Sequence, residues 1–152
     1  MIALIQRVLE VSVAVDSRLV NKIDSGILVL LSIRNDDTES DAKYLASKTV
    51  NLRIFNDENS KMNLSLLDTG YEILVISQFT LHADTRHGNR PSFTDACEPE
   101  RAQLLYKTYI DECKNLIRPE KVKEGIFGAM MKIMLINDGP VTILLRSKND
   151  YQ

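Results

Sequence analysis

Four consecutive residues bring together groups that can act on an ester, namely Ser77-Gln78-Phe79-Thr80. They directly follow residues 73–76, an apolar run rich in β-branched side chains that predicts a buried strand. Where a strand stops, a backbone N–H can lack a partner, and here Gln78 and Thr80 add an amide and a hydroxyl two residues apart. Such groups can hold an ester carbonyl or an oxyanion. The simpler alternative is that they only satisfy the last backbone groups of the strand.

A second unusual stretch is Asn137-Asp138-Gly139-Pro140, which lies between two segments of β-forming residues. A Gly-Pro bond adopts the cis form far more cheaply than other peptide bonds. Its two carbonyls can then point in directions that an ordinary turn does not allow. The alternative is a plain hairpin turn that interrupts two strands.

Residues 82–93 follow the first stretch and contain two arginines, two histidines and a glycine without any periodicity. Such a polar segment predicts either a loop beside an anionic ligand or a solvated connection. A triad of Ser77, His82 and Asp84 can also be drawn. Three such residues within eight positions carry no geometric evidence for it, so we rank the triad low.

The remaining pattern supplies the elements that would position these groups. We expect a long strand over residues 2–15 with a bulge near Leu9 and Glu10, a second strand at 19–23, and a central strand at 27–33, which has no polar face. Thr38 and Asp41 predict a capped helix to about Leu52. A second helix begins near Pro99 and buries one stripe, which includes Cys113.

Composition narrows the class of protein. The length of 152 residues predicts one domain, 1–152, and the net charge of −2 gives no global attraction to phosphate, so a nucleic acid would have to be bound locally. Cys97 and Cys113 are isolated and no Cys/His pair has zinc-site spacing, which predicts free thiols and no metal. The longest aliphatic run, 27–31, is too short to span a membrane, so we expect a cytoplasmic protein.

Taken together and extended to Ser77–Leu81 and Asn137–Thr142, the two unusual stretches resemble the signature motifs of the D-aminoacyl-tRNA deacylases, formerly called D-tyrosyl-tRNA deacylases. The resemblance covers essentially the full length, because four shorter words also fall where that family has similar ones: Gln6-Arg7-Val8, Arg53-Ile54-Phe55, Lys61-Met62-Asn63-Leu64 and Arg90-Pro91-Ser92-Phe93. Two long motifs in the right order are specific. The family usually has glycine where this chain has Ser32, a departure that we expect to change only local packing.

The resemblance implies an α+β fold with barrel-like sheets and two main helices, and a homodimer that needs no cofactor. It implies hydrolysis of the ester between a D-amino acid and the 3′ end of tRNA, with glycyl-tRNA as a secondary substrate. Thr80, Gln78 and the Phe79 N–H would act at the ester, and Ser77 would line the pocket. A cis Gly139-Pro140 would reach in from the partner subunit and exclude L side chains.

Two questions stay open at this stage. Thr80 would act either as a nucleophile or by positioning water, and we favour positioning because no neighbouring base is evident. Two other classes of function also compete with the deacylase: an esterase for small molecules that uses Ser77 or Ser92, and a module that binds RNA ends without altering them.

Overall fold

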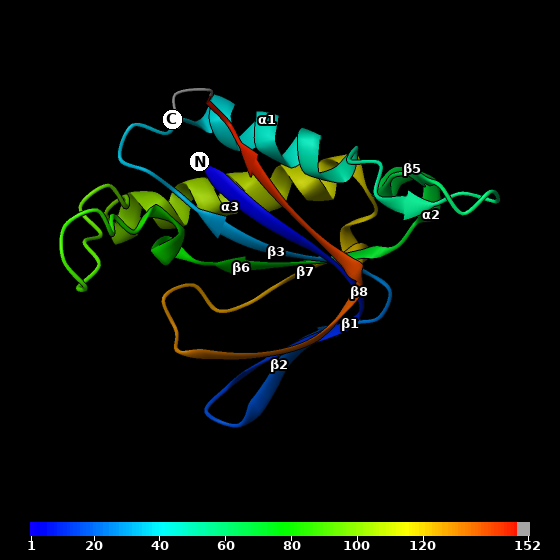
Figure 1. Cartoon of the computed structure of the whole chain (residues 1–152), viewed down its shortest axis with the longest axis horizontal. Helices are drawn as coiled ribbons and strands as arrows, with labels where there is room; N and C mark the ends of the chain where they lie inside the picture. The colour runs from blue at the N-terminus through cyan, green and yellow to red at the C-terminus, as the bar shows by residue number, and fades with distance from the viewer. Residues whose placement is uncertain (149–152) are drawn as a thin grey trace.

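The computed structural model describes residues 1–148 and is organised around two long curved strands, β1 (Ile2–Val15) and β8 (Met131–Arg146). They pair antiparallel along most of their length (Figure 1). β1 also pairs with β2 (Arg18–Ile23) and β3 (Gly26–Ser32), and the sheet continues in parallel through β6 (Glu72–Ser77) to β7 (Val122–Glu124). The strand order is β2-β1-β3-β6-β7, with β8 on β1.

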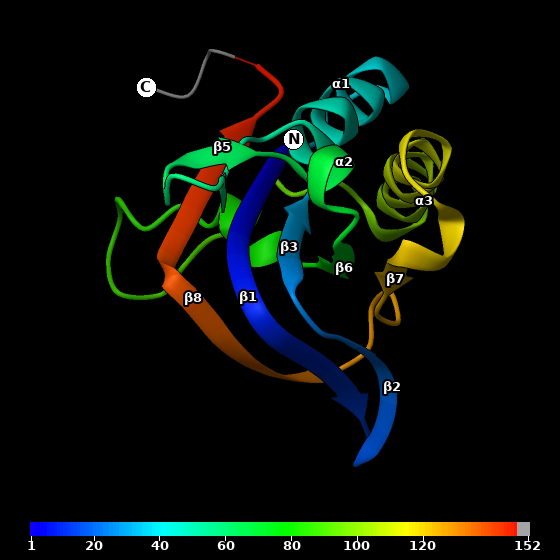
Figure 2. The ribbon, with the colours of Figure 1, turned by 90° about the vertical axis from the view of Figure 1, so that its right-hand side faces the viewer.

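Two long helices, α1 (Glu39–Val50) and α3 (Pro99–Leu116), cover one face of this sheet. Figure 2 shows β1 and β8 curving away from them, so that the sheet nearly closes into a barrel. The shorter elements are β4 (Phe55–Asn56), β5 (Met62–Leu64), α2 (Leu66–Thr69) and two 3₁₀ turns, η1 (Phe79–His82) and η2 (Pro119–Lys121). The predicted α+β class with barrel-like sheets and two main helices is confirmed.

The helices form where the sequence predicts them. Thr38 caps α1, and its side chain and that of Asp41 make the reciprocal bonds of a capping box. Pro99 opens α3, whose inward stripe is buried and contains Ala102, Leu105, Tyr106, Tyr109, Ile110 and Cys113. Burial raises the pKa of Cys113 to about 12, so this thiol belongs to the core rather than to a reaction.

Two cores lie on opposite sides of the sheet. The larger one packs α1 and α3 against the sheet, and the smaller one fills the concave side between β1, β2, β3 and β6. Both long strands contribute to both cores: Ala3 and Ile5 of β1 face the larger core, whereas Val11 and Val13 face the smaller one. A change of core within a strand requires a break in the side-chain alternation, which bulges provide.

That break lies at Asn137–Pro140. The prediction that this stretch interrupts two strands, as a hairpin turn would, is wrong, because β8 continues through it in one direction. In the pairing with β1, Gln6 faces Thr142 while Val8 faces Asn137, so the intervening residues form a wide bulge opposite Arg7. The bulge that we expected near Leu9 is confirmed by a second register shift between Val8 and Glu10.

Candidate active site

An open cleft of about 620 Å³ lies at the end of β6, where the strand gives way to η1. Its lining comes from Ser77–Thr80, the end of β3, the start of α3 and the segment that leads into β8. Apart from the thiol of Cys97, the only polar side chains among these described lining residues belong to Ser77, Gln78 and Thr80. The predicted Ser77–Thr80 group therefore supplies the polar chemistry of an otherwise apolar cleft.

The local backbone explains why the polar residues are presented there. The Gln78 N–H donates to the Leu31 carbonyl of β3 at 2.8 Å, which is the last main-chain tie to the sheet. Gln78 then departs from strand geometry, with φ −146° and ψ 77°, and η1 begins at Phe79. The first amides of such a turn have no acceptor within it, so the Phe79 N–H is suited to receive a ligand oxygen.

The side chains of Gln78 and Thr80 contact each other. The Gln78 amide nitrogen donates to the Thr80 hydroxyl oxygen at 2.5 Å. An amide cannot take up the proton of a hydroxyl, so this contact orients Thr80 without activating it as a nucleophile. Burial raises the pKa of the nearby Cys97 thiol, which disfavours the reactive thiolate. The geometry thus suits oriented donors around an ester rather than covalent attack.

The Ser77, His82 and Asp84 triad is not formed. His82 Nδ1 contacts the Ser32 hydroxyl at 2.5 Å, and both carboxylate oxygens of Asp84 accept from Arg86. Arg86 and the backbone of its turn hold the pKa of Asp84 well below its usual range. A charge relay through these residues would need His82 Nδ1 and Asp84 to face each other, and each faces another group.

Residues 84–93 form an exposed loop that is closed by a bridge between Asp84 and Ser92. Its base is fixed to the site by an edge-to-face contact between Phe79 and Phe93, whose ring centroids lie 5.1 Å apart. The Phe79 side chain is 57% exposed, so this aromatic pair stands at the rim of the cleft.

Gly139 and Pro140 lie outside the cleft lining of their own chain. Their bond is cis, as predicted, and both residues are exposed. Gly139 has φ +128°, and a Cβ there would lie 2.7 Å from Val141 Cγ2 and 3.1 Å from the Val141 nitrogen. The bulge therefore requires glycine at this position.

Two side chains fix this bulge, and the sequence patterns predicted a role for neither of them. Arg7, 7% exposed, donates from Nε to the Asp138 carbonyl at 3.2 Å and pairs with the Asp138 carboxylate at 2.9 Å. The Asn137 amide oxygen accepts from the Val141 N–H at 2.9 Å. An arginine at an inward position of a strand was the available signal, because a buried guanidinium needs several acceptors.

The described residues contain no group of three or more His, Cys, Asp or Glu side chains that could hold a metal ion. Over the same residues, no helix combines the length and the apolar character that crossing a membrane requires.

Comparison with known proteins identifies the class. Residues 4–146 match the family model described as D-Tyr-tRNA(Tyr) deacylase. The chain is 53% identical over 149 residues to the D-aminoacyl-tRNA deacylase of Thermosipho africanus, covering 98% of this chain and 99% of that one. It is 52% identical over 146 residues to the D-aminoacyl-tRNA deacylase of Bacillus velezensis, covering 95% and 97%.

Solved structures agree on the fold. One described as c-Myc DNA Unwinding Element Binding Protein is 42% identical, with a TM-score of 0.93 over 97% of this chain and 99% of that one. A second, described as a probable eukaryotic D-amino acid tRNA deacylase, is 16% identical with a TM-score of 0.81 and covers 95% and 97%, so it supports the fold alone. The chain belongs to the D-aminoacyl-tRNA deacylase family, which confirms the resemblance and the enzyme class predicted from its motifs.

Proposed function

We propose that this enzyme hydrolyses the ester bond that links a D-amino acid to the 3′-terminal adenosine of tRNA, releasing the free amino acid and tRNA. This is a proofreading reaction of translation, and its substrate is met in the cytoplasm. The observation that carries the proposal is the apolar cleft whose polar side chains, a lone thiol apart, all come from Ser77, Gln78 and Thr80. An aminoacyl ester is already activated, so oriented donors can supply sufficient catalysis.

In the proposed reaction the Phe79 N–H stabilises the oxyanion that develops on the ester carbonyl. Thr80, oriented by Gln78, positions the attacking water or the ribose 2′-hydroxyl. Ser77 lines the pocket at the end of β6. Each of these groups would stabilise the transition state more than the bound substrate, because each is already oriented toward the position where charge develops.

The proposal includes a homodimer. The outward face of β8 exposes large apolar side chains: Met134 is 76% exposed and Ile136 is 50% exposed, and Met130, just before the strand, is 91% exposed. A row of this kind marks a protein–protein surface, and a two-fold, self-complementary contact is its commonest use. Met130, Met131 and Ile133 also line the cleft, so the partner would cover the cleft wall itself.

Gly139-Pro140 would then complete the site of the partner. This motif is exposed, lies on the same strand as the apolar row and takes no part in the cleft of its own chain. Its carbonyls would orient the amino group of the substrate so that a D side chain points outward and an L side chain collides. Glycine has no side chain to collide, so glycyl-tRNA would be a second substrate.

One assay tests the reaction and its alternatives. The purified protein is incubated with D-Tyr-tRNA, L-Tyr-tRNA and a simple tyrosine ester, and release of tyrosine is followed for each. We expect release from D-Tyr-tRNA alone. Release from the simple ester would indicate a small-molecule esterase, and binding of charged tRNA without release would indicate an RNA-end-binding module.

The same assay tests the expectation that neither a cofactor nor a metal takes part. Turnover should survive exhaustive dialysis against a strong chelator. A lasting loss of activity that only added zinc restores would contradict the proposed chemistry.

A further inference from the structure

The last residue of β3 and the last residue of η1 meet directly beneath the proposed catalytic segment. The Ser32 hydroxyl oxygen lies 2.5 Å from His82 Nδ1 and 3.3 Å from the Phe79 carbonyl oxygen. Ser32 is 1% exposed and His82 is 8% exposed. Burial of polar groups is costly unless they are hydrogen-bonded, so this contact is an integral part of the interior.

One assignment of hydrogens satisfies both contacts. The Ser32 hydroxyl has a single proton and donates it to the Phe79 carbonyl. Its oxygen then accepts from His82, so Nδ1 of the imidazole carries a hydrogen. The result is a chain of hydrogen bonds from His82 through Ser32 to the main chain of the site.

This series of hydrogen bonds holds the peptide unit that joins Phe79 to Thr80. The Phe79 carbonyl and the Thr80 N–H belong to the same rigid plane, so fixing the carbonyl also fixes the direction from which Thr80 leaves the backbone. β3 thus holds the segment at two points. The Leu31 carbonyl holds the Gln78 N–H whatever the side chains are, whereas the second point exists because residue 32 carries a hydroxyl.

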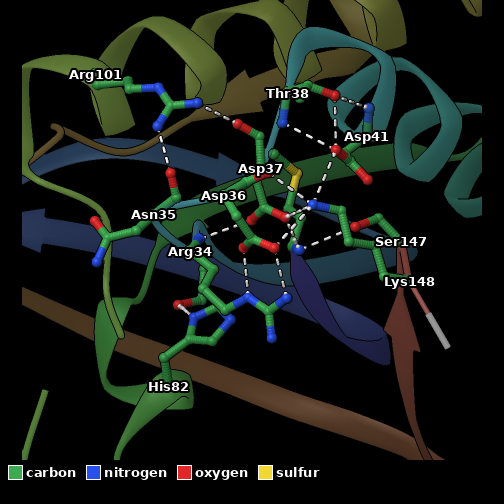
Figure 3. A network of polar contacts seen from close by, with 12 residues as sticks. Arg34, Asn35, Asp36, Asp37, Thr38, Asp41, His82, Arg101, Ser147 and Lys148 are labelled. Carbon is green, nitrogen blue, oxygen red and sulfur yellow. Dashed lines mark hydrogen bonds and ion pairs between the residues drawn. The ribbon is translucent and has the colours of Figure 1, made fainter. Parts of the chain in front are cut away.

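The surroundings of His82 keep the imidazole neutral. Burial is the main cause that lowers its pKa; the Met1 ammonium and Arg34 lower it further, while Asp37 and Asp95 oppose them. Figure 3 shows His82 beside Arg34, at the edge of a polar network that runs through Asp37. In that network Asp37 accepts from the Arg34 N–H at 2.7 Å and from the buried Met1 ammonium at 2.5 Å.

We infer that Ser32 and His82 are positioning residues for ester hydrolysis, acting together through the Phe79 carbonyl to orient Thr80 toward the substrate. The inference rests on the proposed role of Gln78, Phe79 and Thr80. It departs from the expectation that Ser32 changes only local packing. Removal of either side chain should leave substrate binding intact and slow the chemical step, because a reacting group that is displaced by a fraction of an ångström loses much of its effect.

The test is a double-mutant cycle on the full-length enzyme, with Ser32→Ala, His82→Leu and the double variant. Single-turnover hydrolysis of D-Tyr-tRNA should fall about tenfold or more in each single variant. The enzyme concentration for half-saturation should stay within about twofold of wild type. The double variant should be no slower than the single variants, because both substitutions break the same series of hydrogen bonds. His87→Leu, in the exposed loop, is the matched control and should retain the wild-type rate.

Rescue separates positioning from general loss of structure. His82→Asn places an amide nitrogen near the position of Nδ1, so it should recover most of the rate that His82→Leu loses. This pair carries the test if Ser32→Ala folds poorly. Wild-type rates in Ser32→Ala and His82→Leu, equal loss in His82→Asn and His82→Leu, or fully additive losses in the double variant would each overturn the inference.

Thr80→Ala in the same assay keeps the two hypotheses distinguishable. If it is slow while Ser32→Ala and His82→Leu are as fast as wild type, the positioning inference fails and the proposed site stands. If Thr80→Ala hydrolyses D-Tyr-tRNA at the wild-type rate, the proposed site fails, and the inference that depends on it is overturned as well.

Discussion

The turn at Ser77–Thr80 and the bulge at Gly139-Pro140 are fixed in opposite ways. The turn presents side chains to the cleft, and its main chain is tied to the end of β3 by the Leu31 carbonyl and the Ser32 hydroxyl. The bulge presents backbone, and two side chains beneath it, Arg7 and Asn137, fix its shape. The groups proposed to carry out the chemistry and the groups proposed to select the shape of the substrate therefore depend on different kinds of support.

Because of this difference, we expect substitutions in the turn and substitutions in the bulge to have different consequences. Under the proposed mechanism, a change in the turn would remove a polar group from the ester and should reduce the rate for every substrate. A change in or beneath the bulge would alter the shape of the proposed wall of the site and should change which substrates fit. No side-chain substitution within Ser77–Thr80 should therefore create activity on L-Tyr-tRNA, because in the proposed mechanism the bulge selects between D and L side chains.

If the proposed homodimer is correct, the largest effect should come from separating the bulge from the turn of the partner subunit. Met134→Asp combined with Ile136→Asp places two carboxylates on the exposed apolar face of β8, where a dimer would have to bury them. We expect a monomer by sedimentation and no measurable deacylation, since each site would lack its second wall.

Leu67→Asp is the control for that experiment, because Leu67 is an exposed apolar residue of α2. It should leave both the assembly and the rate unchanged. A verified monomer of the β8 variant that deacylates D-Tyr-tRNA at the wild-type rate would show that the bulge and the turn need not come together across subunits.

The next largest effect should follow removal of the Thr80 hydroxyl. Thr80→Ala should lower the single-turnover rate on the order of 10²–10³, as loss of one oriented transition-state group commonly does. Binding of tRNA should hardly change, because one hydroxyl contributes little to holding a whole tRNA end. Thr85→Ala, in the exposed loop, is the control. An unchanged rate in Thr80→Ala would remove this residue from the mechanism.

Gly139→Ala should have a smaller but distinct effect, a loss on the order of 10² in activity on D-Tyr-tRNA. The added Cβ would stand 2.7 Å from Val141 Cγ2 and 3.1 Å from the Val141 backbone, at a φ that L side chains rarely adopt. The bulge must shift to accommodate it. Rates for D-Tyr-tRNA and glycyl-tRNA should both be measured, because a displaced wall should alter their ratio.

Gly70→Ala provides the matched control, since Gly70 also has positive φ but open space around its Cβ position. It should cost stability, about 1 kcal/mol, because an L side chain is disfavoured at this φ, without changing the ratio of the two rates. Equal ratios in Gly139→Ala and wild type would show that the bulge is only a structural feature of β8.

The sequence was sufficient to predict the main helices, the central strand and the polar residues of the cleft. Apolar periodicity was sufficient for α1, α3 and the central strand β3, because each element buries one continuous face or both faces. Ser77–Thr80 could be predicted as part of a site because polar side chains directly follow an apolar strand, whereas the apolar lining of the cleft was not predicted. Local pattern and local structure agree at these places, so the sequence alone is informative.

The supports of the two regions could not be predicted in the same way. Ser32 contacts a residue 50 positions away, and Arg7 contacts one 131 positions away. Sequence periodicity reports the face on which a residue lies, not its partner across the sheet. The prediction that Asn137–Pro140 interrupts two strands was wrong for the same reason, because only the pairing with β1 shows that β8 continues through a bulge.

The smallest effect concerns the support beneath the turn and should appear as a dependence of stability on pH. Burial, the Met1 ammonium and Arg34 lower the pKa of His82 in the folded protein, against Asp37 and Asp95. The unfolded chain therefore binds a proton at His82 more readily than the native state does. By linkage, the free energy of unfolding falls as the pH drops below about 6.5, the value for an unfolded histidine.

His82→Asn removes the titratable imidazole but keeps a hydrogen-bond donor near the Ser32 hydroxyl. Its loss of stability between pH 7 and pH 5 should thus be smaller than that of wild type, as measured by denaturant unfolding at fixed ionic strength. His87→Asn, which replaces the other histidine at an exposed position, is the matched control. Identical pH dependence in wild type and His82→Asn would contradict a lowered pKa of His82 in the folded protein. The turn would then be tied to β3 by the Leu31 carbonyl and the Ser32 hydroxyl, with no contribution from the charge state of His82.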